Sequence, residues 1–302
     1  MRGRNDGHEV CMEEKIPAVV ALGMFDGVHL GHRALIRRTA EEAKESGAKP
    51  VVFTFSNHPM EVLGGSVRLL SDISERNRIL AALGAAEVAS VPFTRETAAL
   101  STEAFVDLLQ SRWKIRSLVV GYNYTCGDHG AGTPQTLAEI GRQCGFSVLV
   151  VPPVRYDGLP VSSTRIREAI ERGEVELAER MLGRRYMLRG TIVENRRIGR
   201  RIGFPTANIE PRENRVLPMD GVYATFACLD GAAYRAVTNL GTNPTVCGKK
   251  RTVETHIIGF DADVYGRELT VAFRRFLRGE LTFASLEALK EQICEDVALA
   301  LR

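Results

Sequence analysis

The sequence predicts an α/β domain built on a parallel sheet, followed by a small β-barrel that ends in a helix. In the first part, short apolar runs alternate with stretches long enough to be crossover helices, which is typical of parallel sheets. After residue 184, the helical pattern gives way to β-branched runs separated by Gly, Pro, Asn and Asp. We therefore expect an extension over residues 1–16, a first domain over 17–183 and a second over 184–302.

The elements of the first domain follow from these runs. Strands are expected at residues 18–22, 51–55, 88–91, 118–120 and 148–151. Helices are expected at 30–46, 73–83, 102–113 and 134–144, with Ser71 and Ser101 as N-caps. Ligands of parallel α/β sheets bind beyond the carboxyl ends of the strands, so the loops at those ends are the expected binding region.

The second domain contains strand-like runs and one terminal helix. The strands are expected at 186–193, 221–229, 234–239, 252–258 and 269–276. Closure into a barrel would remove their exposed edges. The apolar positions of the terminal helix recur every three or four residues, which predicts that one face docks onto the barrel: Phe283, Leu286, Leu289, Ile293 and Val297.

Composition limits the class of protein. The 302 residues, 44% of them apolar, are enough for two domains with buried cores. A net charge of +3 is too small to indicate a nucleic-acid or membrane partner. Six scattered cysteines without a Cys-x-x-Cys pair, and no apolar run of roughly eighteen residues, favour a cytoplasmic protein. We expect a monomer or weak homo-oligomer that binds neither nucleic acid nor membrane.

A glycine-rich turn with two histidines follows the first strand. Gly23 and Gly27 allow a sharp turn, and Gly31 keeps the space between His29 and His32 clear. At the start of a helix, the two imidazoles would lie one turn apart beside backbone N–H groups that favour phosphate. A bare His-x-x-His could equally be a surface pair or a metal site. The ten-residue pattern favours a nucleotide site with the following phosphate-binding residues: Gly23, Phe25, Asp26, Gly27 and Gly31.

Two further segments of the first domain carry polar groups that suit an anionic ligand. Residues 161–167 place hydroxyls and arginines at a helix start, and the predicted phosphate ligands are Ser162, Ser163, Thr164 and Arg167. Alternatively, Ser162 is only an N-cap beside exposed arginines. His58 and Pro59 follow the second strand, where His58 would reach the same sheet end as the histidine pair, although such a histidine is more often a satisfied loop residue.

In the second domain, residues 198–208 can form a loop over phosphates. Gly199 and Gly203 allow the loop to fold, and Pro205 stiffens its exit. The oxygens of Thr206 and Asn208 suit Mg²⁺ shared with ATP phosphates, although an ordinary turn would also read Thr-Ala-Asn. The arginines nearby lack the interleaved aromatics of a nucleic-acid surface. A P-loop motif is absent from the sequence.

These motifs resemble those of a known family. Residues 23–32 are similar to the His-x-Gly-His signature of nucleotidyltransferases in its FAD synthetase form, and Ser-Ser-Thr-x-Ile-Arg at 162–167 is similar to that family's second phosphate motif. Residues 199–208 resemble the riboflavin kinase signature. Over 17–301, the chain resembles the bifunctional riboflavin kinase and FAD synthetase family. The resemblance implies a nucleotidyltransferase-like domain, a six-stranded kinase barrel, and ATP- and Mg²⁺-dependent conversion of riboflavin to FMN and of FMN to FAD.

The resemblance also implies residue roles. Glu254 is the expected base at the flavin hydroxyl, and His29, His32 and Arg167 are expected to stabilise charge during adenylyl transfer. Thr206 and Asn208 are the expected metal ligands. The expected flavin-binding residues are His58, Pro59, Asn123, Tyr124, Asn239, Thr242 and Arg278.

Residues 121–127 depart from the family pattern. Asn123 stands where Asp is usual, and Cys126 replaces a large aromatic. Two alternatives therefore stay open at this stage. One is a riboflavin kinase whose nucleotidyltransferase domain is impaired or altered; the other is a flavin- or nucleotide-sensing regulator whose Arg-rich loop contacts nucleic acid.

Overall fold

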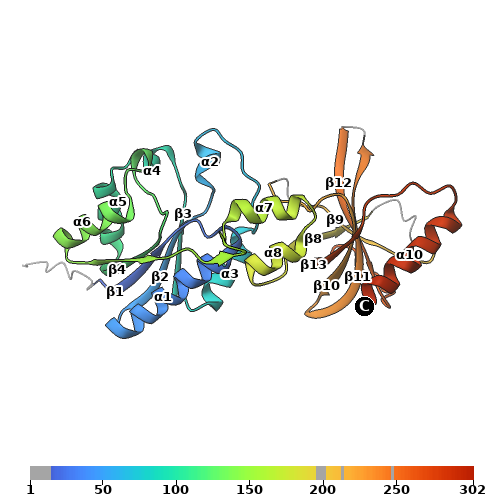
Figure 1. The fold of residues 1–302 in the computed structure, drawn as a ribbon, viewed down its shortest axis with the longest axis horizontal. Helices are drawn as coiled ribbons and strands as arrows, with labels where there is room; N and C mark the ends of the chain where they lie inside the picture. The colour runs from blue at the N-terminus through green and yellow to red at the C-terminus, as the bar shows by residue number, and fades with distance from the viewer. Residues whose placement is uncertain (1–14, 195–201, 212–213, 246–247) are drawn as a thin grey trace, which may run out of the picture. The chain divides into compact units, whose positions relative to one another are not determined.

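The structure is a computed structural model, and it describes residues 15–194, 202–211, 214–245 and 248–302. The chain forms two compact units, which Figure 1 shows with their elements. The first unit comprises Met1–Met24, Ala34–Gly65 and Asn77–Pro152. The second comprises Phe25–Arg33, Ser66–Arg76 and Pro153–Arg302. Two short segments of the early chain therefore belong to the same unit as the whole C-terminal half.

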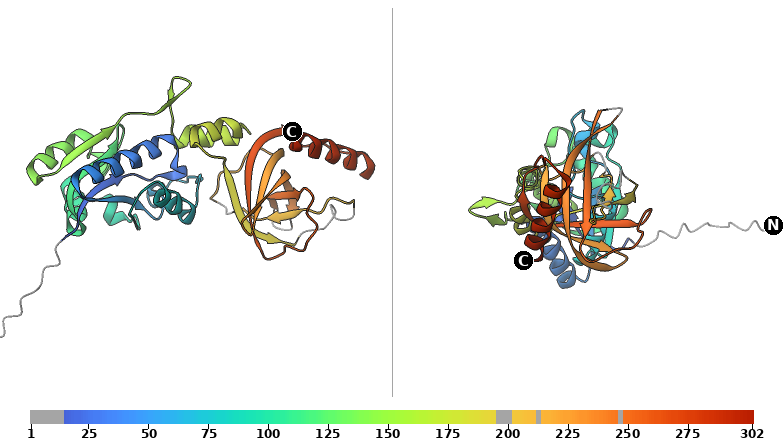
Figure 2. Two further views of the ribbon diagram at one scale, coloured as in Figure 1. Left: turned by 90° about the horizontal axis from the view of Figure 1, so that it is seen from below. Right: turned by 90° about the vertical axis from the view of Figure 1, so that its right-hand side faces the viewer.

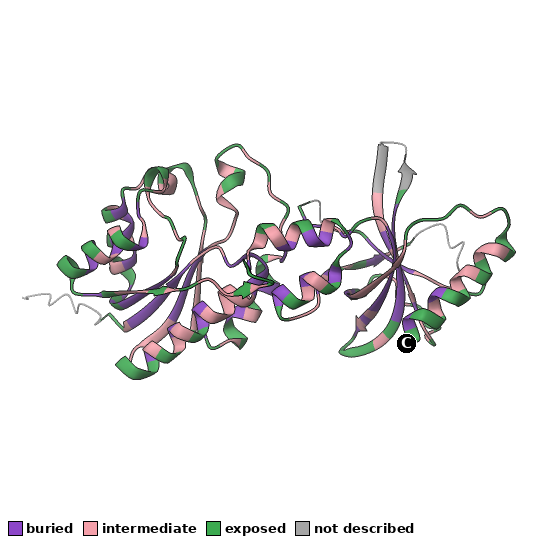
Figure 3. Cartoon of the chain, viewed as in Figure 1, coloured by how far each residue is buried: buried purple, intermediate pink, exposed green. Residues whose placement is uncertain are grey.

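The first unit contains the predicted parallel sheet. Its strand order is β3-β2-β1-β4-β5, and every neighbouring pair is parallel. The central strands are buried on both faces, as Figure 3 shows, because apolar side chains on either side of β1 pack under the crossover helices. The strands are β1 (Pro17–Leu22), β2 (Lys49–Phe55), β3 (Glu87–Val91), β4 (Lys114–Gly121) and β5 (Ser147–Val151).

The four predicted helices are present, and short turns of helix lie between them. Ser101 caps its helix by accepting the N–H of Ala104, as predicted. The prediction for Ser71 was wrong: the helix begins at Ile73, so Asp72 accepts the N–H of Glu75 instead. Within the described ranges, no helix is both long and apolar enough to cross a bilayer. The helices are α1 (Leu30–Ser46), α2 (Pro59–Val62), α3 (Ile73–Ala82), α4 (Arg95–Ala98), α5 (Thr102–Arg112) and α6 (Pro134–Cys144), with single 3₁₀ turns at Asp26–Val28 and Asp128–Gly130.

The second unit contains the closed barrel, whose strands curve around a common interior in Figure 2. Its order is β10-β11-β12-β9-β8-β13, with antiparallel neighbours. β9 is the sixth strand, which the strand pattern missed because it is only three residues long and follows a Gly-Pro-rich loop. The strands are β8 (Met187–Val193), β9 (Ala207–Ile209), β10 (Gly221–Leu229), β11 (Ala232–Thr245), β12 (Gly248–Ile257) and β13 (Glu268–Arg278).

A hairpin and two helices come directly before the barrel along the chain, and apart from the helix start at 161–167 none of them was predicted. A two-residue hairpin joins β6 (Arg155–Tyr156) to β7 (Leu159–Pro160). It leads into α7 (Ser163–Glu171) and α8 (Val175–Leu182). The buried faces of both helices share one hydrophobic cluster with the barrel interior.

Buried threonines of three barrel strands form a chain of hydroxyl groups. Thr238 lies 2.8 Å from the hydroxyl of Thr225 and 3.0 Å from that of Thr255, and all three side chains are buried. Each buried hydroxyl therefore has a partner, which removes the penalty of burying it.

The terminal helix α10 (Leu286–Leu301) packs against β10 and β11, as predicted, although its apolar stripe is only partly buried. Leu286 is 54% exposed, so its predicted core position was wrong. The helix is instead held by the carboxylate of Asp296, which receives two hydrogen bonds from Arg278. Arginines also donate to the last carbonyls of the helix, where cations stabilise the helix dipole: Arg235, Arg274 and Arg275.

Candidate active sites

The glycine-rich turn of the second unit is strongly bent. Gly27 takes φ +76°, and a Cβ there would lie 2.8 Å from the side chain of Leu70, so glycine is required. Gly23 lies in a bend without a positive φ, and Phe25 and Val28 also adopt left-handed backbone. Non-glycine residues rarely do so, and such strain often marks functional loops.

The two predicted histidines are stacked. The ring centroids of His29 and His32 lie 3.6 Å apart with an interplanar angle of 17°. Nδ1 of His29 accepts the backbone N–H of His32 at 3.3 Å, so the neutral ring carries its proton on Nε2 and can donate it. Phe25 packs edge-on against His32. A Cβ on Gly31 would lie 3.1 Å from Cε1 of His29, which supports the predicted role of that glycine.

Both histidines are neutral at physiological pH. Burial, with a smaller contribution from the positive charge of Arg167, lowers the pKa of His29 to about 4. Burial, and secondarily the neighbouring His29, lowers the pKa of His32 well below its usual value. Nδ1 of His32 is buried and has no hydrogen-bond partner among the described residues. Nδ1 of His32, when it carries the proton of the neutral ring, can donate to a bound anion.

Arg167 on α7 is aimed by acceptors from two segments of the early chain. Its Nη2 donates to Oδ2 of Asp26 at 2.7 Å, and its Nε donates to the carbonyl of Arg68 at 2.7 Å. Asp26 also accepts the N–H groups of Leu70 and Ser71, so its carboxylate is occupied by protein donors. Arg167 has five N–H groups, which leaves others for a ligand.

Most of the other polar residues of the 161–167 segment bond to the protein itself. The Ser162 hydroxyl accepts the N–H of Arg165, so Ser162 is the N-cap, the alternative raised by the sequence. Ser163 donates to the carbonyl of Asp26, and Thr164 is exposed. The guanidinium of Arg165 donates to the carbonyls of the β6–β7 hairpin. Of the two arginines, Arg167 is the one that contacts the glycine-rich turn, through Asp26.

The predicted flavin-binding residues of the first domain lie in the first unit. Nδ1 of His58 accepts the N–H of Met60, and Pro59 is the first residue of α2, so both shape that helix start. Asn123 is exposed. Tyr124 is hydrogen-bonded to Cys126, and burial raises the pKa of the Cys126 thiol to about 11, which keeps the thiol protonated.

On the barrel, three predicted residues from adjacent strands lie side by side. Glu254 on β12 is directly opposite Asn208 on β9 and directly opposite Asn239 on β11. Directly opposed residues share a face and lie within contact range. The register thus places the candidate base between a candidate metal ligand and a candidate flavin ligand.

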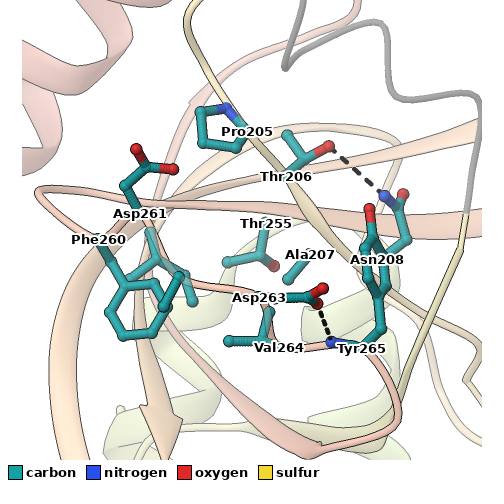
Figure 4. A pocket seen from close by; sticks show the side chains of 12 residues that line it. Pro205, Thr206, Ala207, Asn208, Thr255, Phe260, Asp261, Asp263, Val264 and Tyr265 are labelled. Carbon is teal, nitrogen blue, oxygen red and sulfur yellow. Dashed lines mark hydrogen bonds between the residues drawn. The ribbon is translucent and has the colours of Figure 1, made fainter.

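A pocket opens at the end of β9, shown in Figure 4. Thr206 and Asn208 line one side, with their polar atoms 3.5 Å apart. Asp261 and Asp263 line the pocket as well. Thr206 and Asn208 are two positions apart in the sequence, and Nδ2 of Asn208 donates to the hydroxyl of Thr206. The Thr206 hydroxyl and the Asn208 amide oxygen are the kind of oxygen ligand that a hard cation shares with substrate phosphates. No group of three or more His, Cys, Asp or Glu in the described part of the chain could hold a metal by itself.

The loop before β9 is described only in part. Gly199 lies outside the described residues. Gly203 takes φ +89°, and the carbonyl of Pro205 lies 2.9 Å from Nδ1 of His256, which holds the loop exit on β12. The loop exit is therefore fixed next to the pocket.

Two predicted flavin-binding residues on the barrel have protein partners. Thr242 donates to Asp220, which also pairs with Arg251. Arg278 is bound by Asp296. Asp220 and Asp296 could not be predicted from the sequence, because neither belongs to a motif and only the tertiary fold brings each to its partner.

Comparisons with known proteins place both parts of the chain in known families. A family model described as FAD synthetase matches residues 11–165, and one described as riboflavin kinase matches residues 182–302. The chain is 33% identical to the bifunctional riboflavin kinase/FMN adenylyltransferase of Bacillus subtilis, covering 98% of this chain and 95% of the relative. It is 35% identical to the protein of the same name from Escherichia coli K12, covering 96% and 93%.

A solved structure shows the same arrangement of elements. The crystal structure of a protein named macrolide-efflux protein from Streptococcus pneumoniae matches with a TM-score of 0.89 and 31% identity, covering 95% of this chain and 94% of that one. Two family matches in the expected order, and relatives that are similar over nearly the full length, lead to one assignment. The chain belongs to the bifunctional riboflavin kinase/FMN adenylyltransferase family.

Proposed function

We propose that the chain makes FAD in two ATP-dependent steps, phosphorylation of riboflavin to FMN and adenylylation of FMN with release of pyrophosphate. The observation that carries the proposal is the placement of each motif in a chemically sensible site: Glu254 between Asn208 and Asn239, and a stacked neutral histidine pair at a helix start. We assign the first step to residues 184–302 and the second to residues centred on 17–183.

In the kinase step, Glu254 accepts the proton of the ribityl hydroxyl as that oxygen attacks the γ-phosphorus of ATP, and ADP leaves. Asn239, next to it on β11, orients the flavin. Thr206 and Asn208 would hold Mg²⁺, because both offer oxygens at the pocket and this hard cation prefers oxygen ligands. When bound, that ion spreads the charge of the transferred phosphoryl group.

In the adenylylation step, a phosphate oxygen of FMN attacks the α-phosphorus of a second ATP, and pyrophosphate leaves. Nε2–H of His29 and the remaining N–H groups of Arg167 donate to the phosphate oxygens as negative charge grows on them. The first turn of α1 adds backbone N–H groups. No covalent intermediate with the protein is required, because positioning and charge stabilisation account for the step.

The experiment is a time course with purified protein, riboflavin, ATP and Mg²⁺, in which the flavins are separated by chromatography. FMN that appears first and is followed by FAD supports both steps. FMN that accumulates without FAD supports the alternative of a kinase with an altered nucleotidyltransferase domain, for which Asn123 and Cys126 would be the first residues to examine. Unchanged riboflavin contradicts the proposal.

We further propose a cytoplasmic protein that is a monomer or weak homo-oligomer. The scattered cysteines, without a Cys-x-x-Cys pair, fit a reducing compartment. Light scattering coupled to gel filtration across a concentration series tests the oligomeric state. A mass above that of a monomer that persists at the lowest concentration contradicts it.

A further inference from the structure

The glycine-rich turn before His29, here called the nucleotide turn, lies in the same compact unit as residues 182–302, here called the kinase half. Residues 25–33 and 66–76 share a compact unit with residues 153–302. Leu69 forms a parallel bridge with Arg215: its N–H donates to the carbonyl of Asn214 at 2.6 Å, and its carbonyl accepts the N–H of Val216 at 3.1 Å. The backbone of segment 66–76 is therefore hydrogen-bonded to residues in the region that matches the riboflavin kinase family.

Arg184 reaches the nucleotide turn itself. Its Nη1 donates to the carbonyl of Gly27 at 2.7 Å, and its Nη2 donates to Oε1 of Glu75 at 3.2 Å. The N–H of Gly27 is in turn bonded to the hydroxyl of Ser71 at 3.1 Å. Both backbone polar groups of Gly27, two residues before His29, are thus hydrogen-bonded. The partner of the carbonyl, Arg184, belongs to the kinase half.

A second arginine, Arg215, also contacts Glu75. Nη1 of Arg215 forms an ion pair with Oε2 of Glu75 at 3.5 Å, and its Nη2 donates to the carbonyl of Met187 on β8 at 2.8 Å. The Glu75 and Arg215 side chains are 10% and 7% exposed. Charges so poorly solvated are costly unless they have partners, and each of the two Glu75 oxygens has an arginine partner.

The Arg184–Gly27 contact has a consequence for the chemistry. Gly27 occupies a left-handed conformation between Leu70 and Leu182, and Phe25 and Val28 on either side are also left-handed. Such a turn persists only where its surroundings hold it. Removal of the Arg184 guanidinium would leave the Gly27 carbonyl and the Glu75 carboxylate without that donor, and the turn that presents His29 and His32 would relax.

We propose that Arg184, a residue of the kinase half, is a positioning residue for adenylyl transfer: it fixes the nucleotide turn through the Gly27 carbonyl and Glu75. The inference rests on the proposed function. It implies that FMN adenylylation depends on the kinase half for its geometry, whereas riboflavin phosphorylation does not depend on Arg184.

The test uses the full-length protein and assays each step separately, with FMN and Mg-ATP for the second and riboflavin and Mg-ATP for the first. R184A is compared with R185A, a matched change at the adjacent arginine, which lies over the Phe226 ring and near Glu179 instead of the turn. We expect R184A to lower kcat for FMN adenylylation at least tenfold with little change in the KM for FMN, and to leave the kinase kcat within twofold of that of R185A.

Two additional measurements separate positioning from general destabilisation. Guanidinium ion at non-denaturing concentrations should restore part of the adenylylation activity that R184A loses. It should not raise the adenylylation activity of R185A. R184K, which keeps the charge but lacks the planar fork, should be intermediate, and it decides the question if R184A does not fold. Adenylylation by R184A equal to that by R185A, or an equal loss of both activities, overturns the proposal.

Wild-type protein run in parallel distinguishes the two possible failures. Absence of FAD from wild-type protein contradicts the proposed function. FAD formation by wild-type protein that is unchanged in R184A contradicts only the role of Arg184.

Discussion

The carboxylate of Asp26 accepts a 2.7 Å hydrogen bond from Arg167, a residue 141 positions later in the chain. The same carboxylate accepts the N–H groups of Leu70 and Ser71. Within a motif that suggests phosphate binding, Asp26 is thus occupied by protein donors, and its negative charge would repel a phosphate. Its geometry is that of a counter-ion that aims Arg167 at the nucleotide turn.

We predict that Asp26→Asn impairs adenylylation more than phosphorylation. An amide offers one acceptor oxygen, and its NH₂ would oppose the donors that converge here, so breaking this buried pair should cost about 3–5 kcal/mol. Adenylylation of FMN should fall about 10- to 100-fold through misplacement of Arg167. Separate assays of the two steps and a thermal melt measure this, with Asp107→Asn on the exposed face of α5 as the control. An unchanged rate of FAD formation would show that Arg167 does not need this partner.

The histidine pair predicts proton uptake on ATP binding. The pKa of His29 is about 4 in the folded chain, and that of His32 is well below its usual value, so both rings are neutral at pH 6. Triphosphate next to them favours the charged form and raises both pKa values. Calorimetric titration with ATP at pH 6 in buffers of different ionisation enthalpy should reveal protons taken up. Binding enthalpies that do not depend on the buffer would contradict this.

The same pKa values predict acid sensitivity of the fold. Because the folded pKa of His29 lies below the unfolded value of 6.5, its contribution to stability is fully present above pH 6.5 and is lost as pH falls towards 4. In that window, the free energy of unfolding should fall by about 1.4 kcal/mol per pH unit for each such group. Urea unfolding at pH 7.5, 5.5 and 4.5 measures the slope. His29→Asn, which keeps a side-chain acceptor for the helix cap, should flatten it, and an equal slope in this variant would argue against the assignment.

Glu254 should be essential to the kinase step alone. Glu254→Gln preserves shape but removes the base, so riboflavin phosphorylation should fall about 10²- to 10⁴-fold. FAD formation from supplied FMN should stay unchanged. Glu268→Gln, a matched change at an exposed glutamate of β13, should leave both rates unaltered. A kinase rate within a few-fold of wild type would exclude Glu254 as the base.

The buried hydroxyl chain should stabilise the barrel. Thr238→Val keeps the volume but leaves Thr225 and Thr255 without their shared partner, which should lower the free energy of unfolding by about 1–3 kcal/mol. Thr270→Val, at a half-buried position of β13, is the control. Urea denaturation compares the two. Equal stabilities would mean that the two remaining hydroxyls find other partners.

Local sequence determined most of the architecture and the identity of the motifs. Periodic apolar runs predicted the parallel strands and the helices because burial imposes a period on each element, and the bounds of α1 and α6 were predicted to the residue. The spacing of His29, Gly31 and His32 was readable for the same reason, since one helical turn brings the rings together. β9 was not predicted, because three residues are too few to show a period.

Only the tertiary structure decided which partners the site residues have. Sequence grouped Asp26 with phosphate ligands and Arg278 with flavin ligands, whereas the fold pairs them with Arg167 and Asp296. It also placed Arg184 on the carbonyl of Gly27. Such pairings join residues far apart in the chain and depend on the closure of loops and strands, so no local pattern encodes them.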